Sequence, residues 1–318
     1  MSNGAGPEVA EPGDFLPTLT RLADTRRKLA HAELRGLSDI GRESEGRFLA
    51  AWSAIDSRRR RAIMRAMIDL AEENVDLDFR DVFVACLDDD DAEVRQTAVE
   101  GLWEDDRPRV MRRLLAVFAD DEDESVRARA ALGLGRFAYQ AALEELPADD
   151  ARQLRAVLVG AAANLDLPPD VRRRALEGAG YFSGADVDQA IAGAYASGAA
   201  PLKASAVAAM GHSLDTRWMP IIKAELQSSE PLLRFEAARA AGELGEEAAV
   251  LVPLLVPLAQ GDDAEIYTMA IWALGQVGGE TARRALRNLA QGDESDRQAA
   301  AQEALSELEL DAGSFGLF

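Results

Sequence analysis

Residues 263–278 read DAEIYTMAIWALGQVG, and this stretch decides how the chain folds. The stretch begins with the acidic residue Asp263. The branched apolar residue Ile266 follows, then Ala270 four positions later and the apolar Leu274 four positions after that. Residues four apart share one face of an α-helix, so the stretch predicts a helix with a carboxylate at its start and a narrow apolar face. The same pattern recurs as DAEVRQTAVEGLWED from residue 91, DESVRARAALGLGRF from residue 123 and EPLLRFEAARAAGELG from residue 230.

The period of this repeat is close to thirty residues. In seven of the eight copies a basic residue follows the opening position of the helix, and the eighth has a tyrosine: Arg61, Arg95, Arg127, Arg172, Lys203, Arg234, Tyr267 and Arg297. The intervals are 34, 32, 45, 31, 31, 33 and 30 residues. Each unit reads as a first helix, a turn and a second helix that carries the pattern, and such units stack into solenoids. We therefore predict an all-α chain, a right-handed α-solenoid of about eight helical hairpins.

The chain divides into four predicted segments. Residues 1–14 are rich in Gly, Pro and Glu without periodicity, which predicts a disordered tail. Residues 15–41 contain short helical patterns and are predicted to cap the first repeat. The solenoid is expected over 42–308, followed by a C-terminal tail at 309–318. The longest interval holds an insertion, roughly 138–150, which lengthens either a linker or the first helix of the fourth unit.

Composition narrows the functional classes. The chain of 318 residues has 35 basic and 56 acidic residues, a net charge of −21, which argues against a nucleic-acid partner. No stretch approaches about 18 uncharged apolar residues and no signal peptide is visible, so we expect a cytoplasmic protein without a membrane partner. The single Cys86 lies in the apolar run VFVACL and is predicted to be a buried packing residue.

Aligned second helices show two columns of small residues. The first is alanine, which indicates close helix packing: Ala98, Ala130, Ala175, Ala206, Ala237, Ala270 and Ala300. The second is glycine, with Trp103 in the second unit: Gly135, Gly180, Gly211, Gly242 and Gly275. Glycine near a helix end permits either a close approach or a left-handed exit.

The basic column has two interpretations. It is either a ladder that grips an acidic partner, or an internal ladder in which each cation binds carbonyls or turn acids of the neighbouring unit. Its position beside the apolar opening residue favours the internal ladder.

The phrase V-R-x-x-A-A-x-A-L-G resembles the short HEAT-like repeats of phycobilisome lyases. It is carried by Val126, Arg127, Ala130, Ala131, Leu134 and Gly135, and again by Leu233, Arg234, Ala237, Ala238, Ala241 and Gly242. The resemblance covers about residues 42–308. It implies that the second helices line the concave surface.

On that surface, the helix positions opposite the core stripe are rich in arginine and large side chains. Such residues anchor protein interfaces. We predict a partner-binding set of Arg129, Arg136, Arg174, Tyr181, His212, Arg239, Met269 and Trp272.

Catalytic and metal motifs are missing from the sequence. Only His31 and His212 are present, too few for the paired His-Glu iron ligands of a HEAT-like hydroxylase. No phosphate-binding glycine loop and no Gly-x-Ser-x-Gly elbow occurs. The acidic run at 88–91 lacks the glycine and distal glutamate of an EF-hand.

The sequence therefore predicts a non-catalytic scaffold without a cofactor, which binds a segment of another protein or peptide along the second helices. The alternative is a lyase-like protein that handles a small molecule or pigment. A deep apolar pocket next to Tyr181 would favour that alternative.

Overall fold

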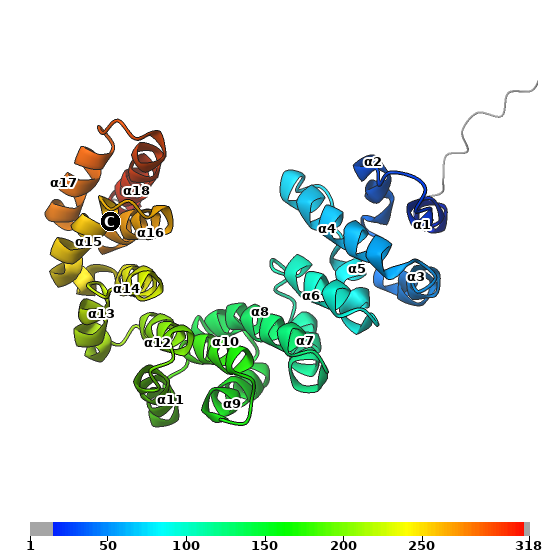
Figure 1. Ribbon diagram of the computed structural model, residues 1–318, viewed down its shortest axis with the longest axis horizontal. Helices are drawn as coiled ribbons and strands as arrows, with labels where there is room; N and C mark the ends of the chain where they lie inside the picture. Colours follow the sequence, from blue (N-terminus) through cyan, green and yellow to red (C-terminus); the bar gives the residue numbers. More distant parts are fainter. Residues whose placement is uncertain (1–14, 315–318) are drawn as a thin grey trace, which may run out of the picture. The chain divides into compact units, whose positions relative to one another are not determined.

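The computed structural model describes residues 15–314, and the chain divides into two compact units, residues 1–137 and 138–318. Every regular element in the described residues is a helix (Figure 1), so the predicted all-α class is confirmed. The tail predicted at 1–14 lies outside the described residues, as do residues 315–318 of the predicted C-terminal tail. No helix between residues 15 and 314 is long and apolar enough to cross a membrane.

Unit 1 consists of two short helices followed by three helical hairpins. In the N-terminal segment, α1 (Leu16–Ala23) packs on α3 and α2 (His31–Leu34) packs on α4. The hairpins are α3 (Glu45–Trp52) with α4 (Ser57–Glu73), α5 (Arg80–Ala85) with α6 (Ala92–Gly101), and α7 (Pro108–Asp120) with α8 (Glu124–Ala142). Short 3-10 turns are η1 (Arg35–Leu37), η2 (Arg42–Ser44) and η3 (Cys86–Asp88). The boundary between the units falls within α8.

Unit 2 adds five hairpins. They are α9 (Ala148–Ala163) with α10 (Pro169–Ala179), α11 (Ala185–Ala196) with α12 (Ala200–His212), α13 (Met219–Glu225) with α14 (Pro231–Glu243), α15 (Val252–Ala259) with α16 (Ala264–Val277), and α17 (Gly279–Leu289) with α18 (Ser295–Ser314). The 3-10 turns η4 (Thr216–Trp218) and η5 (Gly245–Leu251) precede α13 and α15. The second helices α10, α12, α14, α16 and α18 pack on one another in one row, and the first helices form a second row (Figure 1). The described residues therefore contain the eight predicted hairpins, and the α-solenoid prediction is confirmed.

The second helices begin where their sequences predict. Asp91 accepts hydrogen bonds from the backbone N–H groups of Glu93 and Val94, at 3.1 and 3.2 Å. Asp263 does the same for Glu265 and Ile266 at the start of α16. Proline occupies the first turn of α10, α12 and α14. These residues satisfy or remove N–H groups that a helix start leaves unpaired.

The alanine column is buried as predicted except at Ala300. Six of its members are fully buried: Ala98, Ala130, Ala175, Ala206, Ala237 and Ala270. The prediction is wrong for Ala300, which is only half-buried, while Ala301 is fully buried in its place. The opening position of α18 is the exposed Asp296, where six of the other seven repeats carry an apolar residue and the first carries Arg60. Helix α18 therefore turns a different stripe inward, with Ala304 against Gly275.

The glycine column allows successive second helices to touch. A Cβ atom added at Gly180 would lie 2.7 Å from the Cα of Ala209, and one at Gly211 would lie 2.7 Å from the Cα of Ala240. Gly180 itself has φ −57°, which is not left-handed. Of the two readings left open by the sequence, the close approach is therefore the one that the structure adopts at these positions.

The insertion at 138–150 lengthens two helices. The first helix of the fourth hairpin, α9, has 16 residues, as one predicted alternative requires. Helix α8 also extends to Ala142 and reaches 19 residues, which was not predicted. The run AYQAA at 138–142 contains only helix-compatible residues, so the helix of the third hairpin continues into it. Similarly, α18 continues to Ser314, into the segment predicted as a tail.

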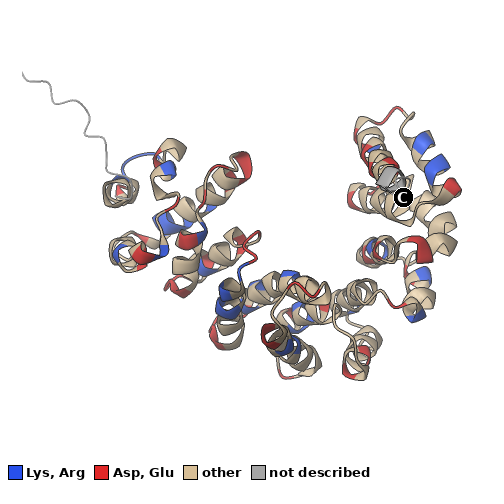
Figure 2. Ribbon diagram, turned by 180° about the vertical axis from the view of Figure 1, so that it is seen from behind, with Lys and Arg blue, Asp and Glu red and all other residues tan. Residues whose placement is uncertain are grey.

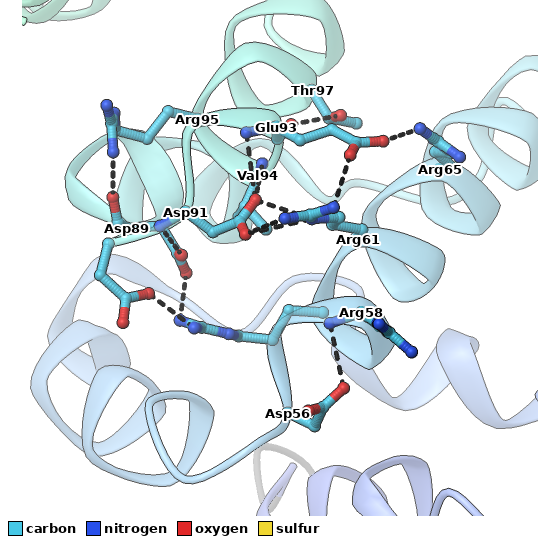
Figure 3. Close-up of polar contacts among 12 residues, drawn as sticks. Asp56, Arg58, Arg61, Arg65, Asp89, Asp91, Glu93, Val94, Arg95 and Thr97 are labelled. Atoms are coloured by element: carbon cyan, nitrogen blue, oxygen red, sulfur yellow. Dashed lines mark hydrogen bonds and ion pairs between the residues drawn. The ribbon is translucent and has the colours of Figure 1, made fainter. Parts of the chain in front are cut away.

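The basic column forms the internal ladder. In unit 1, Arg61 binds the carboxylate of Asp91, and Arg95 binds the backbone carbonyl of Asp89 (Figure 3). Arg95 also binds the carboxylate of Asp121 at 2.8 Å. In unit 2, Arg234 binds the carbonyl of Ser228 and Lys203 binds Glu225, both within 2.8 Å. The tyrosine that interrupts the column continues the ladder, since the guanidinium of Arg297 lies 4.4 Å from the centre of the Tyr267 ring.

Each aspartate of the acidic run at 88–91 forms an ion pair with an arginine. Asp88 pairs with Arg113, Asp91 with Arg61, and both Asp89 and Asp90 with Arg60. The hydrogen bond from Arg61 lowers the pKa of Asp91, because it favours the ionised form. The run therefore joins the second hairpin to the first and to the third by charge pairs.

Candidate protein-binding face

The predicted binding residues fall in both units. Arg129 and Arg136 belong to unit 1. Of the other six, Tyr181 lies in the turn that follows α10, and the remaining five lie on the second helices of unit 2. We define the second-helix face as Arg174, Glu177, Tyr181, Ser205, His212, Glu236, Arg239, Glu243, Met269 and Trp272.

Aromatic rings stack at one end of the second-helix face. The rings of Tyr181 and His212 are parallel within 9°, with centroids 4.1 Å apart. The ring of Tyr139, from the extension of α8, meets Tyr181 edge to face at 5.6 Å. Burial raises the pKa of Tyr181 to about 12, and Glu243 adds to the shift. Tyr181 is therefore a neutral phenol at pH 7, enclosed by two rings.

Glu177 ties the second helices α10 and α12 together. Its carboxylate accepts a hydrogen bond from the Ser205 hydroxyl at 2.6 Å and pairs with Arg174 at 2.8 Å. Its backbone carbonyl lies 2.8 Å from Nδ1 of His212. A carbonyl oxygen only accepts hydrogen bonds, so this bond requires a proton on Nδ1 of His212. Arg174, on α10, and His212, on α12, are thus both held by Glu177.

Arg239 lies between two carboxylates. Its guanidinium is 2.7 Å from Glu236 and 3.9 Å from Glu243, and Oε1 of Glu243 lies 3.4 Å from Nε2 of His212. Burial raises the pKa of Glu236, which opposes its ionisation. Burial also acts to lower the pKa of Arg239, but the charges of Glu236, Glu243 and Glu177 together outweigh it and the net shift is upward. The positive charge of Arg239 is therefore neutralised within the protein.

A pocket of about 460 Å³ opens between α14, α16 and α18. The predicted residues Met269 and Trp272 lie in its wall, and Arg239 reaches its edge. Both Met269 and Trp272 are half-buried. The remaining wall residues are Glu243, Thr268, Ile271, Ala300, Glu303, Ala304 and Glu307. Of the predicted binding residues, these three are thus brought together at one hollow.

The two arginines in unit 1 differ in their surroundings. Arg129 is exposed. Arg136 is half-buried and donates hydrogen bonds to the backbone carbonyls of Trp103 and Asp105. Burial lowers the pKa of Arg136, although the acidic residues around the turn oppose the shift. Its guanidinium secures the turn after α6, so a binding role for it stays a prediction.

We expect Arg136→Ala to lower the free energy of unfolding by about 1.5–3 kcal/mol, because two carbonyls lose a charged donor. Arg129→Ala, on the same helix but exposed, should change it by less than about 0.5 kcal/mol. Urea unfolding followed by circular dichroism measures both. Equal effects would show that the Arg136 bonds contribute nothing to stability.

Comparison with known proteins identifies the family of the chain. A profile of HEAT repeats matches residues 80–163 and 219–306, which together exceed half of the chain. The chain belongs to the HEAT repeat family. No curated protein matches its sequence.

Solved structures similar to this HEAT repeat chain share its fold at low identity. The complex of CpcE and CpcF of phycocyanin lyase from Nostoc sp. PCC7120 is 20% identical, with a TM-score of 0.49, over 72% of this chain and 94% of that one. An engineered protein is 18% identical, with a TM-score of 0.41, over 94% and 92%. Kap95p, described with RanGDP, is 14% identical, with a TM-score of 0.46, over 93% of this chain and 45% of its own.

The sequence interpretation missed two features of these HEAT repeats. Tyr139 was assigned to an insertion, although its helical spacing from Arg136 was readable. Trp103 was seen only as a break in the glycine column. It is 58% exposed and lines a separate pocket of about 360 Å³ in unit 1, next to Glu100 and Glu104. A large aromatic residue in a column of glycines was the signal that could have indicated this pocket.

Proposed function

We propose that this HEAT repeat protein is a non-catalytic scaffold that binds a segment of another protein along the second-helix face of unit 2. The observation that carries the proposal is the pocket at Met269 and Trp272. Methionine, tryptophan and arginine are enriched in protein interfaces, and partly open aromatic residues beside a hollow are typical anchors. HEAT repeats present their second helices as one continuous row, which suits an extended segment.

The reactive groups of the described residues support a binding role over a catalytic one. Cys86 is fully buried, and this burial raises its thiol pKa well above the ordinary value. The phenol of Tyr181 stays protonated at pH 7, because burial raises its pKa to about 12. An activated nucleophile has a lowered pKa. The pKa shifts of Cys86 and Tyr181 run in the opposite direction.

The lyase-like alternative receives less support from the geometry. It calls for a deep apolar pocket next to Tyr181. The Tyr181 ring is instead covered by His212 on one face and approached by Tyr139 at its edge. The pocket on this face lies further along, at Trp272.

Site-specific photo-crosslinking tests the proposal. A benzoylphenylalanine is placed at Thr268 or Gln276, which are exposed on α16, in cells that naturally make the protein. The matched control carries it at Gln189, exposed on the first helix α11. We expect one common partner at residues 268 and 276 and none at residue 189. Trp272→Ala should reduce the crosslinked product about tenfold or more, as for an interface anchor.

Two outcomes would refute this function. One is crosslinking at residue 189 with the same yield and partner as on α16. The other is an undiminished product in Trp272→Ala when circular dichroism shows that the variant is folded.

A further inference from the structure

The pocket between α14, α16 and α18 joins an apolar floor to an acidic rim. Its floor consists of Met269, Ile271, Trp272, Ala300 and Ala304. Its volume of about 460 Å³ lies within the range of roughly 300–1,000 Å³ that is usual for ligand sites. It is thus large enough to receive one or two side chains of a bound segment.

Gly242 fixes the indole of Trp272. A Cβ atom at Gly242 would lie 2.4 Å from Cζ3 of Trp272, so the ring fills the space that a side chain on α14 would need. Trp272 remains only half-buried, and its open part faces the solvent beside Met269. The indole is therefore a preformed aromatic surface whose position does not depend on a ligand.

The charge at the rim is negative. Glu243, Glu303 and Glu307 face a single cation, Arg239, so the lining residues sum to 1 − 3 = −2. Arg239 is already paired with Glu236 and Glu243, which leaves it little capacity for an anionic ligand. Figure 2 shows Asp and Glu residues on the helices on either side of the mostly uncharged α16.

Glu303 and Glu307 lack a basic partner among the described residues. They are exposed, and they lie four positions apart on α18. Like charges at this spacing destabilise a helix, and a cation between them removes the repulsion. The interaction that the structure gives Glu307 is a long hydrogen bond of 3.4 Å from the neutral amide of Gln276. The rim thus offers two carboxylates without a basic partner among the described residues, next to the half-buried indole of Trp272.

From this geometry we infer that the pocket binds an arginine of the partner segment, together with an adjacent apolar residue. The inference rests on the proposed function, and it names the chemistry of the partner: a basic segment. The guanidinium stacks on Trp272 and pairs with Glu303 and Glu307, while the apolar neighbour contacts Met269. Arginine fits better than lysine because its planar group both stacks on aromatic rings and pairs bidentately with carboxylates.

Synthetic peptides test the chemistry on the full chain. We compare four capped eight-residue peptides in which leucine alternates with arginine, lysine, glutamine or glutamate. Isothermal titration calorimetry is run at 50 and 300 mM NaCl. The arginine peptide should bind at least tenfold more tightly than the glutamine and glutamate peptides at both salt concentrations. Equal binding of the glutamate peptide, or no binding of the arginine peptide, would overturn the inference.

A matched pair of variants separates the pocket from the general negative charge of the protein. Glu303→Gln with Glu307→Gln removes two rim charges, and Glu246→Gln with Glu247→Gln removes two exposed charges on η5. We expect the first pair to weaken the arginine peptide about tenfold and the second to change its affinity less than twofold. Similar losses in both would show that only the overall charge attracts the peptide, and the site would be rejected.

The crosslinking experiment distinguishes failure of this inference from failure of the proposed function. A partner captured at residues 268 and 276 through a segment without arginine would leave the function standing and overturn the basic-segment inference. Capture through an arginine-containing segment would support both. If no partner is captured on α16, the proposed function itself fails.

Discussion

Replacing Asp89 with alanine is expected to lower the free energy of unfolding by about 3–5 kcal/mol, the usual cost of removing one partner of a buried ion pair. The Asp89 side chain is 1% exposed and lies 2.8 Å from Nη1 of Arg60, whose side chain is 7% exposed. The same carboxylate accepts a hydrogen bond of 2.7 Å from the indole N–H of Trp52 and one of 2.9 Å from the backbone N–H of Asp91.

The variant leaves several buried donors without their partner. The indole of Trp52 is buried and Arg60 keeps only Asp90, at 2.6 Å near the surface. Burial raises the pKa of Asp89, which shows that its charge is costly to hold there without these donors. Because Trp52 belongs to α3 and Arg60 to α4, the loss should loosen the packing of the first hairpin against the second.

Asp90→Ala is the matched control. Asp90 is adjacent in sequence and binds the same arginine, but its side chain is 81% exposed, so we expect a loss of about 0–1 kcal/mol. Urea unfolding gives the free energies, and hydrogen–deuterium exchange in α4 and α6 locates the effect. Equal costs for the two alanine variants would contradict the buried role assigned to Asp89.

The second large effect is expected at Gly180. A Cβ atom there would lie 2.7 Å from both the Cα and the carbonyl oxygen of Ala209, a backbone contact that no side-chain rotation relieves. Gly180→Ala must therefore separate α10 from α12. Overpacking of this kind costs about 1–3 kcal/mol. The added methyl group would also disturb the neighbouring Tyr181, so the stack with His212 should open.

Gly193→Ala provides the opposite expectation. Gly193 lies inside α11 with no atom within 4 Å of an added Cβ, so alanine meets open space. Its better helix propensity should stabilise the protein by about 0.5–1 kcal/mol. Thermal and urea unfolding of the two variants measure the difference. A stabilising Gly180→Ala would show that α10 and α12 do not approach as closely as described.

Much of the fold was readable because each repeat encodes it locally. The acidic cap, the buried alanine and the proline of the first turn lie within about fifteen residues of one another, and they place all eight second helices. Helical spacing also indicated which side chains lie opposite the core. Three of the residues selected in this way, Arg239, Met269 and Trp272, line one pocket. The prediction for Ala300 was wrong because α18 opens with the exposed Asp296, where the six preceding repeats have a buried apolar residue.

The state of each charged side chain on that face was not readable. The sequence shows Arg136, Arg174 and Arg239 as similar exposed arginines. In the structure, Arg136 binds backbone carbonyls 31 and 33 residues away, while Arg174 and Arg239 bind glutamates on their own helices. The partners of Arg136 depend on how adjacent hairpins rotate against each other, and spacing within one helix does not specify that rotation.

The sequence by itself therefore determined the HEAT repeat architecture, its eight hairpins and the row of second helices, because short-range periodicity and caps set them. Only the tertiary structure decided that Arg136 binds the carbonyls of Trp103 and Asp105 and that Trp272 borders an acidic hollow with Glu303 and Glu307. These relations join residues about thirty positions apart. They arise from the packing of one hairpin on the next, which the sequence of a single repeat does not contain.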